Sequence, residues 1–256
     1  MSSKLYSLEG KKALVTGASR GIGRAIALGL AEAGADVALC SRKQPDLEVV
    51  AQEIAAIGRK ALPVAANVRI KEELYPMAEK VLSEFGRIDI LVNNAGTNPV
   101  YGDIIDLEER AWDTVMNVNL KGVFLLSQFV AKNSMIPHKG GSIINVASQS
   151  GFRPDPGIGA YCVSKAGLIM LTKVMASELG KYHIRVNNIA PGWVKTKLSQ
   201  IMWSDPERLA KAEEQSPLGR VGMPEDIVGA AVYLASDASS YVTGATIVLS
   251  GGAFMH

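Results

Sequence analysis

The sequence of 256 residues has few side chains that could form disulfides or bind metals. Its two cysteines, Cys40 and Cys162, are too few for a disulfide scaffold or a cysteine-based zinc site. Its three histidines, His138, His183 and His256, lie far apart and lack the short spacings of zinc ligands. We therefore expect no metal site and a reducing compartment.

Long apolar runs and an excess of one charge are missing as well. No apolar run reaches the ~18–20 residues that span a bilayer, and residues 1–10 lack the apolar core of a secretory signal. The 27 basic residues nearly balance the 25 acidic ones, so the net charge of +2 gives no electrostatic case for nucleic-acid binding. We expect a soluble cytoplasmic protein that binds neither membranes nor nucleic acid.

What the chain does contain is a regular alternation of short aliphatic runs and longer amphipathic stretches. Its length fits one α/β domain over residues 1–256, with 48% hydrophobic residues to form the core. The predicted strands cover residues 13–16, 37–40, 61–65, 88–92, 142–146, 184–189 and 246–249. The predicted helices cover residues 21–34, 47–57, 71–85, 161–179 and 224–234. This pattern predicts a doubly wound parallel sheet with helices on both faces and ligands at the carboxyl ends of its strands.

One segment departs from the alternation. Residues 191–222 form a long insertion between the sixth strand and the last helix, where we expect a substrate lid. The apolar residues of this insertion and of two nearby loops predict a mostly apolar substrate pocket. They are Leu198, Ile201, Met202, Trp203, Val100, Tyr101, Phe152 and Ile158.

The first predicted strand ends in a glycine-rich turn, Thr16-Gly17-Ala18-Ser19-Arg20-Gly21-Ile22-Gly23. Glycines at 17, 21 and 23 allow a tight turn and a close approach of the backbone to a diphosphate at the start of the next helix. The spacing G-x-x-x-G-x-G differs from the commoner G-x-G-x-x-G. Its place between a strand and an amphipathic helix indicates a nucleotide site.

The end of the second strand indicates which nucleotide. A site for NAD places a carboxylate here against the ribose 2′-hydroxyl, but this chain has Ser41 followed by Arg42. Arg20 of the glycine turn can reach the same corner. Two guanidinium groups and no carboxylate favour a 2′-phosphate, and therefore NADP(H).

A tyrosine and a lysine one helical turn apart, Tyr161 and Lys165, are the candidate catalytic pair. A lysine ammonium beside a phenol favours the phenolate, so we expect a lowered tyrosine pKa and a usable acid or base. Ser148 ends the fifth strand, where its hydroxyl could bind a substrate oxygen. It has no Gly-x-Ser-x-Gly elbow, which argues against an esterase nucleophile.

Two asparagine-containing stretches complete the candidate site. Asn93-Asn94-Ala95-Gly96 ends the fourth strand and can border a cofactor. Asn119 is a polar residue in an otherwise apolar helical stretch, so its amide either satisfies an internal need or faces a polar site.

Taken together, these motifs and Pro191-Gly192-x-Val194-x-Thr196 resemble the classical short-chain dehydrogenase/reductases, along nearly the whole chain. The resemblance implies a single Rossmann-type domain with a seven-stranded parallel sheet, assembled as a homotetramer. It implies that Tyr161 is the general acid, that Lys165 lowers its pKa and binds the nicotinamide ribose, and that Ser148 holds the substrate oxygen. Asn119 would anchor a water of a proton relay, and residues 191–196 would grip the nicotinamide through Val194 and Thr196.

One motif departs from the family pattern. The third strand usually ends in an aspartate that binds adenine, and here Asn67-Val68 stands in that place, where the amide oxygen can still accept from the adenine amino group. A finer similarity is to NADPH-dependent carbonyl reductases of the peroxisomal retinol-dehydrogenase type. It lies in Ser41-Arg42-Lys43-Gln44, Asn98-Pro99, and Lys195-Thr196 followed by Met202-Trp203-x-Asp205.

We therefore expect an NADP(H)-dependent oxidoreductase that interconverts a small hydrophobic ketone or aldehyde and its alcohol. A 3-oxoacyl-[acyl-carrier-protein] reductase of the same fold is an alternative, for which only Lys132 and Lys139 offer a basic docking surface. A non-catalytic NADP-binding scaffold is a further alternative, which the intact Ser148, Tyr161 and Lys165 disfavour.

Overall fold

Seven strands, most of them apolar along their length, pair into one sheet in the computed structural model, which describes residues 2–255. Every neighbouring pair is parallel, in the order β3-β2-β1-β4-β5-β6-β7. The strands are β1 Lys12–Thr16, β2 Asp36–Ser41, β3 Ala61–Ala65, β4 Ile90–Asn93, β5 Gly141–Val146, β6 Ile184–Pro191 and β7 Thr246–Leu249. The predicted doubly wound, seven-stranded parallel sheet is confirmed.

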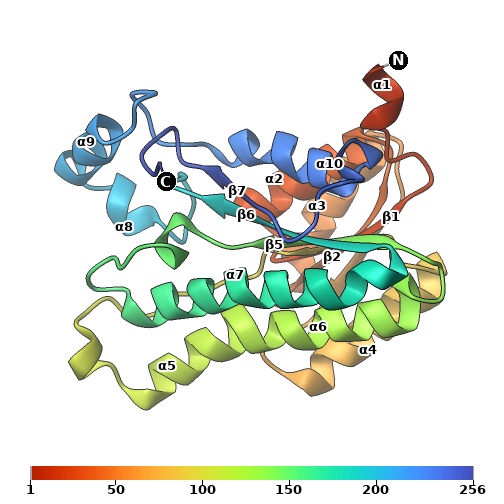
Figure 1. Cartoon of the computed structure of the whole chain (residues 1–256), viewed down its shortest axis with the longest axis horizontal. Helices are drawn as coiled ribbons and strands as arrows, with labels where there is room; N and C mark the ends of the chain where they lie inside the picture. Colours follow the sequence, from red (N-terminus) through yellow and green to blue (C-terminus); the bar gives the residue numbers. More distant parts are fainter. Residues whose placement is uncertain (1, 256) are drawn as a thin grey trace.

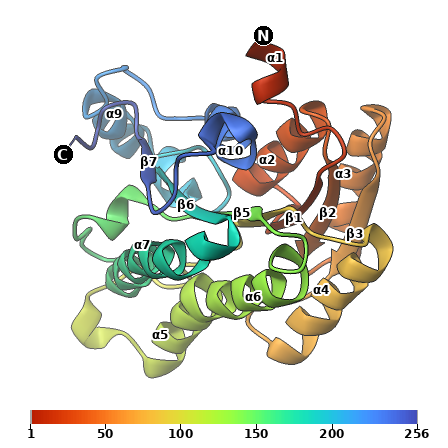
Figure 2. The ribbon, with the colours of Figure 1, turned by 45° about the vertical axis from the view of Figure 1, so that its right-hand side comes forward.

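Helices cover both faces of this sheet, as Figures 1 and 2 show. One face carries α2 (Gly21–Glu32), α3 (Gln44–Ala56) and α10 (Val228–Ala235). The other carries α4 (Lys71–Phe85), α6 (Gly122–Val130) and α7 (Gly159–Leu179). The remaining α-helices are α1 Ser2–Leu5, α5 Glu109–Met116, α8 Gln200–Trp203 and α9 Pro206–Glu214. The shorter helical turns are η1 Ile104–Asp106, η2 Asn117–Lys121, η3 Ala131–Met135, η4 Gln149–Gly151, η5 Gly180–Tyr182, η6 Pro224–Ile227 and η7 Asp237–Ser239.

An apolar core forms on each face of the sheet, because successive side chains of a strand point to opposite faces. On β1, Val15 packs into the core under α2, α3 and α10. Its neighbour Leu14 packs into the core under α4, α6 and α7. Both side chains are fully buried. None of the helices between residues 2 and 255 is long and apolar enough to cross a membrane.

Several element boundaries differ from the predicted ones by one or more residues, those of α3, β4 and the last helix among them. The helix predicted from residue 47 begins at Gln44, because Pro45 stands in its first turn, where proline is well tolerated. The strand predicted from residue 88 begins at Ile90, since the Ile88 backbone bonds to the Ser134 hydroxyl through both its N–H and its carbonyl. The last helix, predicted over residues 224–234, is divided into the 3-10 turn η6 and α10.

A row of polar side chains, three of them buried asparagines, crosses four strands of the sheet. Asn93, Asn145, Asn188 and Thr246 occupy paired positions on β4, β5, β6 and β7. Asn93 donates to Asn145 (2.9 Å), and Asn188 donates to Thr246 (3.1 Å). Thr172 of α7 bridges the middle, accepting from Asn145 and donating to Asn188, each at 2.8 Å. This amide row fixes the register of the four strands relative to one another.

Replacing Asn145 with alanine should therefore destabilise the protein strongly. The change removes an acceptor of Asn93 and the donor to Thr172 in a fully buried place. Loss of these bonds should lower the free energy of unfolding by about 2–4 kcal/mol, measured by urea denaturation. Asn133→Ala, which removes one exposed bond to Phe129, is the control and should change it by about 0.5 kcal/mol or less. Equal effects of the two changes would contradict the role of the row.

Candidate active site

The carboxyl ends of the strands open into one long cleft of about 1180 Å³. Each predicted cofactor-binding or catalytic residue except Asn119 lines it. These residues are Gly17, Ser19, Arg20, Gly21, Ile22, Gly23, Ser41, Arg42, Asn67, Val68, Asn94, Ala95, Gly96, Ser148, Tyr161, Lys165, Pro191, Gly192, Val194 and Thr196. Residues more than 170 positions apart in the chain thus share one surface.

The glycine turn at one end of the cleft has no room for a side chain at Gly17 or Gly23. Gly17 has φ of +66°, a left-handed conformation that favours glycine. A Cβ on Gly23 would lie 2.3 Å from both the Asn94 Nδ2 atom and the Gly17 carbonyl oxygen. Asn94 Nδ2 itself donates to the Thr16 carbonyl at 2.9 Å and holds the turn.

The turn leads into α2, whose 12 residues place free N–H groups and a positive dipole end at the cleft. Bare backbone beside a helix N-terminus is a site for phosphate groups. The residues present fit a dinucleotide, which these glycines and the start of α2 would hold by its diphosphate.

The corner beyond the turn is basic. Arg20, Arg42 and Lys43 line the cleft around the end of β2. Ser41 Oγ is buried there and has no hydrogen-bond partner among residues 2–255. A buried hydroxyl without a partner costs about 1–3 kcal/mol, so this corner is suited to a ligand with strong acceptor groups.

The end of β3 places Asn67 and Val68 on the cleft wall. Asn67 Oδ1 accepts a hydrogen bond from the Arg69 N–H at 3.2 Å. The oxygen keeps a second lone pair, since an amide oxygen accepts two bonds. Binding of adenine by this amide stays a prediction.

The segment after β6 closes the cleft opposite the glycine turn. The Thr196 Cγ2 atom lies 3.4 Å from the position of a Cβ on Gly21, so the two walls meet there. Ser199 Oγ donates to the Val194 carbonyl at 2.5 Å, and Trp203 Nε1 donates to the Thr196 carbonyl at 2.8 Å. These bonds fold residues 194–203 into a compact wall.

The candidate catalytic pair lies in the first two turns of α7. Lys165 is almost fully buried, and its Nζ donates to the Val146 carbonyl of β5 at 2.6 Å. Nζ lies 5.5 Å from the centre of the Tyr161 ring. The Ser148 hydroxyl forms a hydrogen bond with the Tyr161 side chain and also accepts from the Ser150 N–H at 3.1 Å. Serine, tyrosine and lysine thus form one cluster.

The expected lowering of the tyrosine pKa is wrong for this structure. Burial raises the pKa of Tyr161 to about 12, although the hydrogen bond with Ser148 opposes the rise. Burial also lowers the pKa of Lys165 to about 8. The ammonium bonds a main-chain carbonyl rather than the phenol oxygen, so its field does not overcome desolvation. At neutral pH the phenol keeps its proton, as an acid must.

Asn119 lies behind the cleft, in the π turn η2 between α5 and α6. Its side chain is fully buried and makes three hydrogen bonds. Oδ1 accepts from the Thr97 N–H (2.8 Å), while Nδ2 donates to the Thr97 carbonyl and to Ser164 Oγ, each at 3.0 Å. The amide therefore ties the segment after Gly96 to α7. The π turn is a common feature beside functional sites.

Half of the apolar residues predicted for the substrate pocket lie in the cleft. Tyr101, Ile158, Leu198 and Met202 line it, whereas the other four predicted apolar residues do not. Sequence reasoning missed several polar or aromatic lining residues, because nothing local to them signals a cleft. They include Thr97, Gln149, Ser150, Asp155, Trp193, Lys197, Ser199 and Arg208.

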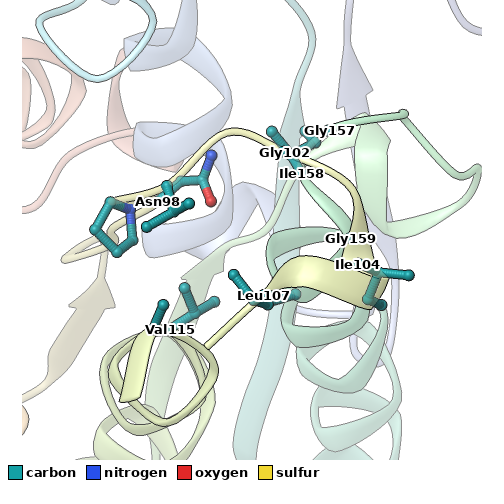
Figure 3. A pocket seen from close by; sticks show the side chains of 12 residues that line it. Asn98, Gly102, Ile104, Leu107, Val115, Gly157, Ile158 and Gly159 are labelled. Atoms are coloured by element: carbon teal, nitrogen blue, oxygen red, sulfur yellow. The ribbon is translucent and has the colours of Figure 1, made fainter. Parts of the chain in front are cut away.

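A second, minute cavity of about 10 Å³ lies beside the start of α7 (Figure 3). In Figure 3 the segment from Asn98 to Gly102 passes over it, with Leu107 and Val115 below. Gly102 and Ile158 form an isolated bridge at its rim. A space of this size holds one water at most, so it is a packing gap beneath the 98–104 segment.

No cluster of three or more histidine, cysteine, aspartate or glutamate side chains that could hold a metal occurs within residues 2–255. His256 lies outside the described residues. Cys40 and Cys162 are unpaired.

Comparison with known proteins agrees with this geometry. The sequence profile of the family described as enoyl-(acyl carrier protein) reductase matches residues 17–253. The chain is 41% identical to 2-dehydro-3-deoxy-D-gluconate 5-dehydrogenase of Escherichia coli K12, over 96% of both chains. It is 40% identical to dehydrogenase/reductase SDR family member 4 of Caenorhabditis elegans, over 98% of both. The chain belongs to the short-chain dehydrogenase/reductase family.

Other family members extend the range of relatives. The 3-oxoacyl-[acyl-carrier-protein] reductase of Thermotoga maritima is 42% identical over 96% of this chain and 98% of its own. A short-chain type dehydrogenase/reductase from Mycobacterium marinum superposes with a TM-score of 0.93 at 42% identity, over 99% of both chains. Gluconate 5-dehydrogenase from Burkholderia cenocepacia, solved with NADP and tartrate, gives a TM-score of 0.94 at 34% identity, over 99% of this chain and 98% of that one.

The raised tyrosine pKa can be measured directly. In protein without cofactor, Tyr161 should remain a phenol from pH 7 to about 10, because its pKa is raised to about 12 and not lowered. The difference in tyrosinate absorbance between the wild-type protein and Tyr161→Phe should therefore stay near zero over this range. A full tyrosinate difference below pH 9 would show that Lys165 dominates after all.

Proposed function

We propose that this protein is an NADP(H)-dependent oxidoreductase that interconverts a ketone or aldehyde and an alcohol, with Tyr161 as general acid and base. The observation that carries the proposal is the Ser148–Tyr161–Lys165 cluster at the carboxyl end of β5, inside a cleft that fits a dinucleotide. When bound, the nicotinamide would supply or accept the hydride.

In the reductive direction the protein's own residues handle the proton. The Tyr161 phenol, protonated at neutral pH because its pKa is raised, donates its proton to the carbonyl oxygen. The Ser148 hydroxyl holds that oxygen in place. Lys165, anchored on the Val146 carbonyl, supplies positive charge beside the phenol as negative charge develops on it. Asn119 ties the Thr97 backbone to Ser164 behind this cluster, and its π turn borders the proposed water relay.

Preference for NADP(H) over NAD(H) rests on the basic corner. The guanidinium groups of Arg20 and Arg42 are donors only, and the unpartnered Ser41 hydroxyl can donate as well, so together they suit an acceptor group on the ribose. The Burkholderia relative solved with NADP supports this choice. Thr196 and the Val194 backbone would hold the nicotinamide carboxamide.

The substrate is a small molecule reached beneath a lid formed by residues 191–222. α8 and α9 lie beyond the end of the sheet (Figure 1), and the Tyr101 hydroxyl donates to the Leu198 carbonyl across the opening at 3.4 Å. Relatives named as a dehydrogenase/reductase and as dehydrogenases of gluconate or a gluconate derivative support carbonyl–alcohol chemistry. The Thermotoga relative keeps a carrier-linked substrate as the second candidate, tested by an acyl-carrier-protein substrate.

We further propose a homotetramer located in the cytoplasm. α7 exposes Val163, Met170 and Val174 on one side, and α6 exposes Phe124. These apolar side chains, together with the open edge of β7, are suited to contacts between copies of the chain. The two unpaired cysteines are compatible with a reducing compartment.

Tyr161→Phe should reduce kcat for carbonyl reduction by about 10²–10⁴-fold, since it removes the proton donor. NADPH affinity, measured by fluorescence titration, should hardly change, because the hydroxyl acts on the substrate. Ser148→Ala should lower the rate with the same unchanged affinity, whereas Lys165→Ala should impair both. Tyr241→Phe, at a fully exposed tyrosine, is the control. A Tyr161→Phe enzyme with most of its activity would refute the assignment of the acid.

The cofactor preference should reverse when the basic corner is made acidic. Ser41→Asp combined with Arg42→Ala removes charge-assisted contacts of about 1.5–3 kcal/mol each and adds a carboxylate suited to a ribose hydroxyl. The ratio of kcat/KM for NADPH to that for NADH should fall from above one to below one. Arg110→Leu, at an exposed arginine outside the cleft, should leave the ratio unchanged. A wild-type protein that uses NADH equally well would rule out the preference.

A further inference from the structure

Gln149 is an unusual residue of the cleft. It follows Ser148 directly, begins the turn η4, and lines the cleft although its side chain is only 2% exposed. Its Oε1 atom is buried and accepts no hydrogen bond from any residue between 2 and 255. Since a buried acceptor without a donor is destabilising, its presence beside the reacting centre calls for a donor from outside the chain.

The other buried atoms of this kind have an explanation. Within the described residues they are Ser41 Oγ, Glu53 Oε2, Arg59 Nε, Gln149 Oε1 and Arg153 Nε. The three charged ones lie in ion pairs, Glu53 with Arg24, Arg59 with Asp36 and Arg153 with Asp155. The two neutral ones both line the cleft, Ser41 at the end of β2 and Gln149 directly after Ser148.

The position of the carboxamide is well defined. Gln149 Oε1 lies 2.9 Å from the place of a Cβ on Gly192, and the Ser250 backbone lies equally close on the same side. Gly192 therefore gives the carboxamide its room, and Oε1 lies between η4 and the end of β6. On this wall it is next to Ser148, which would hold the reacting oxygen of the substrate.

We infer that Gln149 determines substrate specificity by accepting a hydrogen bond from a substrate hydroxyl near the reacting carbonyl. The inference rests on the proposed function and narrows it to hydroxylated ketones and the corresponding diols or polyols. The carbonyl oxygen itself is an acceptor, so it cannot satisfy Oε1. A second, donor-bearing group on the substrate is needed, on the adjacent carbon or the next one.

A hydroxyl fits this place better than an amino group. A charged ammonium would require a carboxylate nearby. Asp155 is the acidic residue that lines this end of the cleft, and it is already engaged by the Ser150 hydroxyl and by Arg153. Gln149 thus offers a neutral acceptor, which suits a neutral donor.

The first test compares ketones of equal carbon number. With NADPH as the reductant, kcat/KM is measured for 2-butanone, 3-hydroxy-2-butanone and 4-hydroxy-2-butanone. At least one hydroxyketone should exceed 2-butanone by about tenfold or more, because a site built to bond a hydroxyl discriminates against an analogue that lacks it.

The second test changes the residue. Gln149→Met, which keeps the length but removes the acceptor, should lower this ratio at least about tenfold and raise Tm, since the buried acceptor is gone. Gln149→Glu keeps an acceptor oxygen and should retain part of the preference. NADPH affinity, measured by fluorescence titration, should stay within about twofold in Gln149→Met. Gln52→Met, on the exposed side of α3, should change neither the ratio nor Tm.

Three results would overturn the inference: 2-butanone reduced as efficiently as both hydroxyketones, an unchanged ratio in Gln149→Met, or a loss of NADPH affinity in that variant that exceeds its loss of selectivity. The last would place the carboxamide against the cofactor. Absence of NADPH oxidation with all three ketones is a different failure, which overturns the proposed function itself and this inference with it.

Discussion

The hydrogen-bonded row of Asn93, Asn145 and Asn188 is the constraint on which the site depends. Parallel strands that are purely apolar could slip in register at little loss of burial, but a buried amide that loses its partner is left unsatisfied. The row therefore fixes where β4, β5 and β6 end relative to one another. The glycine-bordered loop after Asn93, the serine after β5 and the lid after β6 all start from those fixed ends.

Burial around α7 has two opposing effects on the catalytic cluster. It removes water from Tyr161 and Lys165, and this disfavours the charged form of each, so the tyrosine pKa rises while the lysine pKa falls. The same dry surroundings strengthen the electrostatic interactions of any charge that develops there during reaction. The Val146 carbonyl of β5 accepts a hydrogen bond from Lys165, and the Ser148 hydroxyl after β5 bonds Tyr161. The site is thus prepared to donate a proton rather than to hold a phenolate.

The sequence predicted the sheet, and nearly all of its candidate site residues lie in the cleft, because both follow from local patterns. Aliphatic runs define strands, and the residues after those runs must meet at one edge of a parallel sheet. The predictions that failed concern a strand boundary and a pKa, both of which depend on partners from distant segments of the chain. Ile88 leaves the strand because of Ser134, and the direction of the Tyr161 pKa depends on where Lys165 Nζ finds its acceptor. The missing partner of Gln149 could not be read from its neighbours in sequence.

Ser41 and Gln149 suggest how the two ends of the cleft are related. A chain selected for stability alone would replace both with apolar residues, because each leaves a neutral polar atom buried without a partner. Ser41 lies beside Arg42, where a charged group of a ligand would form the missing hydrogen bond with the Ser41 hydroxyl. Gln149 lies beside Ser148, where a neutral donor group of a ligand would do the same for Gln149 Oε1. The chemical character of each ligand is therefore encoded in what surrounds the unsatisfied atom: guanidinium groups at one end, and at the other an acidic residue already paired within the protein.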